Sequence, residues 1–335
     1  MTAPSKTGRP SITRRRALQG LAASAGALAA PMLWAQADKT YRLLVGFPPG
    51  GGTDAVARLL AEKLKPELGG ANFLVENKAG AGGQLAAQAL KAAPADGHTL
   101  FLTHDHTVSI LPLVVKNPGF DPAHDFVPVA GFATFANALA LSGGTPARSV
   151  AEYVQWVKTS QGGKSALGIP APASVPEFMV KVLAQKFGLD LISAPYRGSA
   201  PMMADMLGNQ IAGGVGSIPD LIENHRSGKV RVVAVMGDKR QAILPDVPTL
   251  AEVGVAGFEE LPYYGVFAPA GAPREVLDRF SEALARVLGQ AEVKERLTNM
   301  GLSVGYMNAA QLGARERAYT AVWTKIIRAS GFQPA

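Results

Sequence analysis

The sequence predicts an α/β fold in which mostly parallel strands alternate with helices. Short apolar runs are followed by glycine-rich turns and then by stretches with apolar residues at helical spacing. The clearest of these turns lies at residues 46–53 and contains three consecutive glycines. The chain has 335 residues, which is more than one hydrophobic core usually serves, so we expect two domains or one large one.

The first third of the chain alternates strand and helix. The expected elements are a strand at 41–45, a helix at 55–64, a strand at 73–76, a helix at 84–91 and a strand at 100–103. In the first helix Val56, Leu59, Leu60 and Leu64 share one face. In such a doubly wound arrangement, ligands bind at the carboxyl ends of the strands.

The same alternation continues after a polar, proline-punctuated stretch at 117–128. A strand at 138–141 could cross between domains, and it is followed by a helix at 148–159, a strand at 166–169 and a helix at 176–187. A strand ending at Pro195 precedes a helix at 199–207, and strands at 211–215 and 230–236 flank a helix at 219–226. Further helices are expected to start at Pro273 and Ala309. Ser174 with Glu177, and Thr249 with Glu252, have the spacing of capping boxes. Ser174 is therefore expected to cap a helix, and the exposed helix start could also contact a ligand.

The first glycine-rich turn predicts an anion site made of backbone. A strand that becomes a helix through three glycines presents unpaired N–H groups at the positive end of the helix dipole. The spacing nearly matches a P-loop, but Gly52 stands where the phosphate-binding lysine would be. The turn therefore suits a carboxylate, with a plain tight turn as the alternative. We expect Asp54 to cap the next helix or to hold a bridging water rather than to contact a ligand amine.

Residues 1–37 predict an export signal. They contain five basic residues and no acidic one, so without them the net charge of +7 falls to +2, and a role in nucleic-acid binding loses its main support. Arg14 and Arg15 precede a stretch rich in Ala, Gly and Leu, and residues 35–37 offer a peptidase site. These features favour a twin-arginine signal, with the general secretory route as the alternative. We expect a periplasmic protein that starts near Asp38.

The chain contains no cysteine. Lipoprotein anchoring, disulfide bonds, thiol chemistry and thiolate metal sites are therefore excluded.

Six short segments carry a resemblance to a known family. They are Phe47-Pro48-Pro49-Gly50-Gly51-Gly52-Thr53-Asp54 with Arg58, Val75-Glu76-Asn77-Lys78-Ala79-Gly80-Ala81-Gly82-Gly83, Asp96-Gly97-His98-Thr99-Leu100, Pro195-Tyr196-Arg197-Gly198, Leu244-Pro245-Asp246-Val247-Pro248-Thr249-Leu250-Ala251-Glu252 and Ala268-Pro269-Ala270-Gly271-Ala272-Pro273. In this order they resemble the periplasmic solute receptors of tripartite tricarboxylate transporters, known as the Bug family, over residues 40–330.

The resemblance implies a two-lobe periplasmic binding protein of the α/β, type II clamshell kind, with two crossing strands. Lobe 1 would comprise residues 38–140 and 238–335, and lobe 2 residues 141–237. Such a receptor captures a small organic carboxylate between its lobes and delivers it to the membrane permease subunits of a tripartite transporter. We expect a monomer that is not an enzyme and that uses no cofactor, metal or nucleic acid.

The resemblance also implies which loops meet in the cleft. The expected ligand-binding residues are Phe47, Pro49, Gly50, Gly51, Thr53, Asp54, Lys78, Gly82, Thr103, His104, Ser174, Tyr196, Gly198 and Ser217. Two departures from the family pattern touch specificity positions. A proline-rich loop at 170–174 stands in place of a glycine-rich one, and Tyr263 and Tyr264 stand where a tryptophan is common. A ligand is therefore not carried over from any relative.

Two alternatives follow from the residues around the third strand. His104 and His106 would point the same way in an extended chain, which is metal-ligand geometry, but a complete ligand set is not evident. Either histidine could also be the base of a periplasmic hydrolase or lyase acting on a small acid. The chain has no Gly-x-Ser-x-Gly motif and no cysteine nucleophile to support such an enzyme.

The loops expected from the second lobe, at 169–176, 195–199 and 216–219, contain apolar residues, hydroxyls and Arg197 but no acid. This composition favours aromatic or short aliphatic carboxylates over zwitterionic amino acids, whose ammonium would lack a partner.

Overall fold

The computed structural model describes residues 40–329 and 331–334. The expected export signal at 1–37 lies outside these residues. In the described part of the chain, none of the helices combines the length and the apolar character needed to cross a membrane.

A six-stranded mixed sheet organises the first lobe. Its strands are β1 (Thr40–Val45), β2 (Asn72–Asn77), β3 (Thr99–His104), β4 (Phe126–Phe135), β10 (Tyr263–Pro269) and β11 (Leu302–Asn308). They lie in the order β11-β4-β10-β3-β1-β2. β1 is parallel to β2 and β3, whereas β10 runs antiparallel to β3 and β4, and β11 antiparallel to β4.

Helices cover both faces of this sheet because its strands are apolar on both sides. Leu43 and Val45 of β1 pack into one core with α2 (Gly52–Glu67), α10 (Arg274–Gly289) and α11 (Ala291–Asn299). Leu44, between them, packs into the other core. That core contains α3 (Gln84–Lys91), the π-helical segment η2 (His106–Ile110), α4 (Leu111–Val114) and α12 (Ala309–Ala329). The short segments η1 (Ala81–Gly83) and α5 (Pro122–Asp125) complete the lobe.

A five-stranded sheet organises the second lobe. Its strands are β5 (Asn137–Ser142), β6 (Lys164–Ile169), β7 (Asp190–Pro195), β8 (Gly213–Ser217) and β9 (Val230–Val235), in the order β7-β6-β8-β5-β9. β6 is parallel to β7 and β8, and β5 is antiparallel to β8 and β9. Its helices are α6 (Val150–Ser160), α7 (Val175–Phe187), α8 (Ser199–Leu207) and α9 (Ile218–Arg226).

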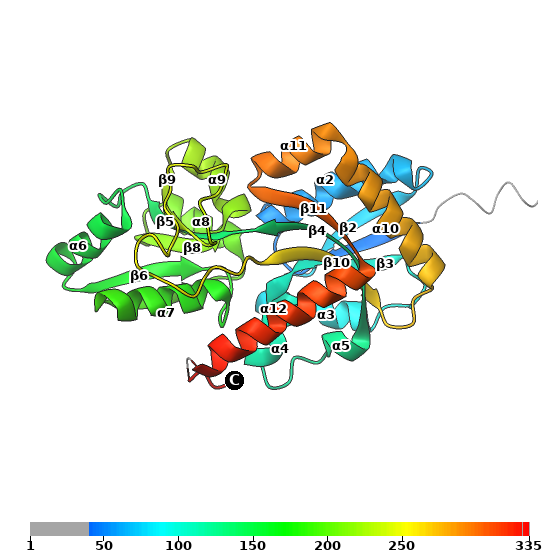
Figure 1. The fold of residues 1–335 in the computed structure, drawn as a ribbon, viewed down its shortest axis with the longest axis horizontal. Helices are drawn as coiled ribbons and strands as arrows, with labels where there is room; N and C mark the ends of the chain where they lie inside the picture. Colours follow the sequence, from blue (N-terminus) through cyan, green and yellow to red (C-terminus); the bar gives the residue numbers. More distant parts are fainter. Residues whose placement is uncertain (1–39, 330, 335) are drawn as a thin grey trace, which may run out of the picture. The chain divides into compact units, whose positions relative to one another are not determined.

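Two segments of chain cross between the sheets (Figure 1). β4 ends at Phe135 and β5 begins at Asn137, so the first crossing is a nearly continuous strand interrupted only at Ala136. The second crossing, residues 236–262, leads from β9 to β10 and contains no helix or strand of its own. Consequently the carboxyl ends of β1, β3 and β4 and the start of β10 lie at the edge from which the chain enters the second sheet.

The structure confirms the α/β class and most of the expected elements. The expected elements did not include β4, β10, β11, α11 or the short helices α4 and α5. The capping box of Thr249 and Glu252 is confirmed, since Thr249 N–H donates to Glu252 Oε2 (2.7 Å) and Glu252 N–H donates to Thr249 Oγ1 (3.1 Å). The box expected at Ser174 is wrong. Ser174 occupies the N-cap of α7, but its hydroxyl donates to the carbonyl of Ala171.

Candidate functional site

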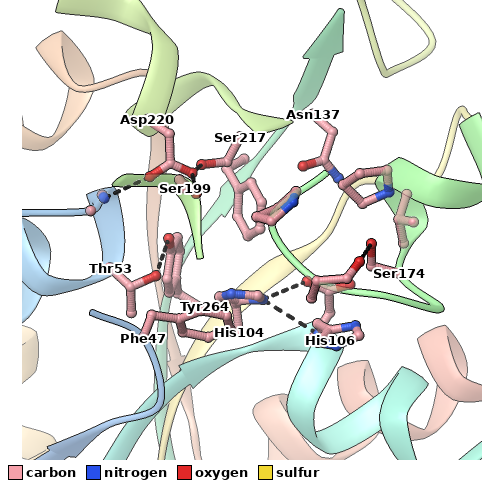
Figure 2. A pocket seen from close by; sticks show the side chains of 18 of the residues that line it. Phe47, Thr53, His104, His106, Asn137, Ser174, Ser199, Ser217, Asp220 and Tyr264 are labelled. Atoms are coloured by element: carbon pink, nitrogen blue, oxygen red, sulfur yellow. Dashed lines mark hydrogen bonds and ion pairs between the residues drawn. The ribbon is translucent and has the colours of Figure 1, made fainter. Parts of the chain in front are cut away.

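A pocket lies between the facing edges of the two sheets (Figure 2). The space between its atoms, counted together with the opening to solvent, is about 590 Å³. Its lining residues are Phe47, Pro48, Gly51, Gly52, Thr53, His104, Asp105, His106, Phe135, Asn137, Pro170, Ala171, Ser174, Val175, Pro176, Ser199, Ser217, Asp220 and Tyr264. Both lobes contribute to it.

The first-lobe side of the pocket is an aromatic wall, formed by Phe47, His104, Phe135 and Tyr264. The rings of Phe47 and His104 stack with centroids 4.7 Å apart. His104 meets the rings of Phe135 and Tyr264 edge-on, and those two lie 4.8 Å apart. Phe47 follows β1, His104 ends β3, Phe135 ends β4, and Tyr264 is the second residue of β10. The wall is therefore held in shape by contacts within its own lobe.

The glycine-rich turn before α2 is braced from behind by Asp54. Its carboxylate accepts hydrogen bonds from the amide of Gly50 (3.0 Å), from Arg58 (3.0 Å) and from Asn77 (2.9 Å). Burial alone would raise the pKa of Asp54, but these hydrogen bonds lower it, so the group is held as a carboxylate. The N-cap of α2 is Gly51, so the expectation that Asp54 caps this helix is wrong. Asp54 positions the turn and does not line the pocket.

Four helices begin at the pocket. α2 starts beside Thr53, α7 beside Val175, α8 at Ser199 and α9 just after Ser217. The amides of Thr53 and Val175 make no hydrogen bond within the described residues. Because the first N–H groups of a helix lack intrahelical partners and carry partial positive charge, the pocket offers backbone donors to an anion.

One carboxylate of the protein already occupies part of this donor set. Asp220 Oδ1 accepts from the amide of Gly52 (2.7 Å), and its Oδ2 accepts from the hydroxyls of Ser199 (2.7 Å) and Ser217 (2.6 Å). Asp220 belongs to α9 of the second lobe and Gly52 to α2 of the first, so this bond joins the lobes. In the view of Figure 2, Asp220 lies with both serines above Phe47, His104 and Tyr264.

The fit at this point is tight. A Cβ atom at Gly52 would lie 2.9 Å from Pro219 Cβ and 3.0 Å from Asp220 Oδ1, closer than side chains normally pack. A Cβ at Gly51 would meet only ordinary contacts, 3.6 Å from the carbonyl of Pro48 and 3.7 Å from Asp220 Oδ1. The glycine at 52 is therefore required for this approach of the two lobes.

Tyr264 closes the pocket next to Thr53. Its hydroxyl lies 3.1 Å from Thr53 Oγ1. Burial raises the pKa of Tyr264 strongly, and the negative charges of Asp220 and Asp105 raise it further. The phenol is therefore a neutral hydrogen-bonding group that interacts electrostatically with both carboxylates.

The two histidines after β3 do not have the expected arrangement. β3 ends at His104 and the chain turns helical at Asp105, so the alternation of an extended strand does not apply and the predicted metal geometry is wrong. Among residues 40–329 and 331–334, no group of three or more potential metal ligands is found. His104 Nδ1 lies 3.3 Å from Asp105 Oδ1. Burial, assisted by His104 and opposed by Asp105, lowers the pKa of His106 to about 4, and its Nδ1 has no partner among the described residues.

The structure brings together only part of the predicted site. Six expected residues line the pocket: Phe47, Gly51, Thr53, His104, Ser174 and Ser217. Gly82, Tyr196 and Gly198 line a neighbouring hollow that shares Phe47 and Pro170 with the pocket, and Gly50 lines an outer groove. The remaining four, Pro49, Asp54, Lys78 and Thr103, line none of these. The Lys78 ammonium lies 3.8 Å from the carboxylate of Glu76, and Thr103 is fully buried.

Seven pocket residues with polar or aromatic groups are absent from the set predicted as ligand-binding: Asp105, His106, Phe135, Asn137, Ser199, Asp220 and Tyr264. Phe135 and Asn137 flank the first crossing, and no local pattern indicated a strand before residue 138. Asp220 lies one residue beyond the expected loop at 216–219. A capping pattern could have indicated it, because Ser217 at an N-cap is followed by Asp220 three positions later.

Comparison with known proteins agrees with the fold. Residues 56–332 match the family described as "Tripartite tricarboxylate transporter family receptor". The chain is 32% identical to a UPF0065 protein of Cupriavidus necator, over 87% of this chain and 89% of that one. It is 29% identical to the protein BugT of Bordetella pertussis over 87% and 89%.

Three solved structures are similar over nearly their whole length. The periplasmic binding protein BugD has a TM-score of 0.83 and 30% identity, covering 89% of this chain and 99% of that one. The R. palustris protein Rpa4515 with adipate has a TM-score of 0.83 and 29% identity, with coverage of 89% and 99%. MatC of Rhodopseudomonas palustris with bound malate has a TM-score of 0.77 and 28% identity, with coverage of 87% and 99%. The chain therefore belongs to the Bug family of tripartite tricarboxylate transporter receptors, which are two-lobe solute-binding proteins.

Proposed function

We propose that this protein is a periplasmic receptor that captures a small organic carboxylate in the pocket between its lobes. The observation that carries the proposal is the pocket itself, where four helices begin and two amides, those of Thr53 and Val175, are unpaired in the described structure. A carboxylate bound there would be held by backbone dipoles and hydroxyls. The relatives that contain adipate and malate support this chemistry.

The same proposal assigns roles to the lining residues. Thr53 and the start of α7 would donate to the ligand carboxylate, Asn137 would add an amide from the crossing strand, and the aromatic wall would cover the ligand body. We propose that the two lobes close on the ligand as separate bodies. Their expected boundaries lie after residues 140 and 237. These contact assignments and bounds stay predictions.

The transport partners follow from the family. We propose that the loaded receptor delivers its ligand to the membrane permease subunits of a tripartite transporter and acts as a monomer. We do not favour the alternative of a periplasmic hydrolase or lyase, because the chain belongs to a family of receptors.

Native mass spectrometry of protein purified without dialysis tests the function. We expect a retained small acid on the folded protein, released intact and with unchanged mass after denaturation. A chemically altered molecule would indicate an enzyme. A folded protein that retains nothing and binds no carboxylate afterwards would contradict the proposal.

Export can be tested separately. Replacing Arg14 and Arg15 by lysine should trap the precursor in the cytoplasm if the twin-arginine route is used. Normal periplasmic accumulation of this double variant, with cleavage after Ala37, would show that the general secretory route is used instead.

A further inference from the structure

The charged side chains that line the pocket are all acidic. Asp105 and Asp220 are the carboxylates, and within the described chain no lysine or arginine lines the pocket. Nearby cations are engaged or face elsewhere. Arg58 pairs with Asp54, Lys78 lies next to Glu76, and Arg197 lines the neighbouring hollow. A ligand that enters this pocket therefore meets two negative charges without a compensating cationic side chain.

His106 does not compensate these charges at neutral pH. His106 is 94% buried and loses its proton well below neutrality, so it faces the pocket as an uncharged imidazole. The helix N-termini at the pocket contribute positive potential there.

Asp220 already uses part of that potential. It takes the first amide of α2 and the hydroxyls at the starts of α8 and α9. The amides of Thr53, which directly follows Gly52, and of Val175, at the start of α7, stay available to a ligand. Two amides suit one ligand carboxylate. A second ligand carboxylate placed next to Asp220 would lie beside a like charge with no cationic side chain in the lining, which is costly for a buried anion.

The space between Asp220 and the aromatic wall suits a positive charge instead. In the view of Figure 2, Asp220 lies above the rings of Phe47 and Tyr264. A carboxylate attracts an ammonium directly, and the face of an aromatic ring attracts it through its quadrupole. No contact of this kind would favour an anionic group at the same place.

We infer that the ligand carries one carboxylate and one ammonium or quaternary ammonium group, and that Asp220 selects this zwitterion against di- and tricarboxylates. The inference rests on the proposed function, because it assigns the ligand class of the same pocket. It reverses the preference expected from the sequence, whose premise was that the second-lobe loops contain no acid. Asp220 lies just past the last of those loops and faces the pocket.

Two pairs of probes isolate the charge. Glycine betaine and 3,3-dimethylbutanoate have the same shape and differ in a quaternary nitrogen against a carbon. 4-Aminobutyrate and glutarate have similar lengths and differ in an ammonium against a second carboxylate. Titration calorimetry on full-length mature protein, freed of retained ligand by unfolding and refolding, gives the affinity ratio within each pair. We expect the zwitterion of at least one pair to bind roughly tenfold more tightly than its partner.

A variant pair assigns the preference to Asp220. Asp220→Asn keeps the acceptor for Gly52 and should reduce that ratio about tenfold. Glu223→Gln removes the same charge one helical turn further along α9, at a residue that does not line the pocket, and should leave the ratio unchanged. Circular dichroism confirms that both variants fold.

The outcomes separate the inference from the proposed function. Equal or tighter binding of 3,3-dimethylbutanoate and glutarate would overturn the inference and leave the carboxylate receptor standing. An unchanged ratio in Asp220→Asn would overturn the role of Asp220. If the folded protein binds none of the four probes, the zwitterion assignment fails. If it also binds no other carboxylate, the proposed function fails with it.

Discussion

The two sides of the pocket are built in different ways. The first-lobe side is a set of rings packed on one another within that lobe, with a glycine-rich turn braced by Asp54. The second-lobe side consists of helix starts, hydroxyls and Asp220, and one of its bonds reaches across to Gly52. The comparison indicates that the first lobe supplies shape and apolar contact, whereas the second lobe supplies charge selection and the link that closes the pocket.

The largest expected effect comes from adding a charge where the two sides meet. Gly51→Asp places a second carboxylate beside Asp220 without a steric clash of its Cβ, since a Cβ at 51 meets only ordinary contacts and the backbone there is extended. Like-charge repulsion should separate the lobes and weaken ligand binding by roughly a hundredfold or more. Calorimetry checks this.

Gly51→Ala is the matched control, because it adds the same Cβ without the charge, and it should bind nearly as well as the wild type. Full affinity in a folded Gly51→Asp protein would show that the two sides do not meet at this point.

The second prediction tests whether His106 is uncharged in the folded protein. The pKa of His106 is about 4 in the folded protein, against an ordinary value of 6.5. Between these values the unfolded chain binds a proton that the folded chain does not, so the free energy of unfolding falls as the pH is lowered from 6.5 to 4. The loss attributable to His106 is about 3 kcal/mol. Urea unfolding across this range measures it.

His106→Gln should flatten that pH dependence, whatever constant offset the substitution adds. Parallel stability curves for the wild type and the variant would mean that His106 is protonated as easily as in water.

The third prediction concerns the hydroxyls that hold Asp220. Ser217→Ala removes one charge-assisted hydrogen bond and leaves the carboxylate less firmly placed. Ligand affinity should fall by about 1.5–2 kcal/mol. Ser142→Ala removes a serine hydroxyl bond in the same sheet, far from the pocket lining, and should lower stability without changing affinity. Similar affinity losses in both variants would point to a general effect on folding.

The smallest expected effect lies in the aromatic wall. Phe47→Leu keeps apolar bulk but loses the stacking on His104. Affinity should fall by about 1 kcal/mol for all probes, with a slightly larger loss for a trimethylammonium ligand. Thermal shifts for the four probes measure this. A loss confined to one probe would show that the first lobe also selects by charge.

The sequence predicted the parts of the site that follow from local pattern. The strand-to-helix turn at 46–53 predicted where backbone donors lie, and His104 and Ser217 were expected because they stand at strand ends. Lys78 and Thr103 were expected in the pocket for the same reason, but Lys78 lies near Glu76 and Thr103 points into the core. Position at a strand end does not fix the direction of a side chain.

The remaining residues depend on contacts that no local pattern encodes. Asp220 meets Gly52 across 168 positions of sequence, and only the approach of the two lobes brings them together. Phe135 ends β4, which contains a proline and a glycine in its interior. Both residues are typical of loops, so this segment was not recognised as a strand from the sequence. The polar stretch at 117–128 was therefore expected to lead directly to the strand at 138–141, with no strand between them.

A crystal structure of the protein with the tightest-binding probe tests the central claim most directly. We expect the ligand between Phe47 and the start of α7, with its carboxylate about 3 Å from the amides of Thr53 and Val175 and its ammonium directed toward Asp220. A ligand carboxylate at the Gly52 amide in place of Asp220, or a ligand in the neighbouring hollow beside Arg197, would contradict the account.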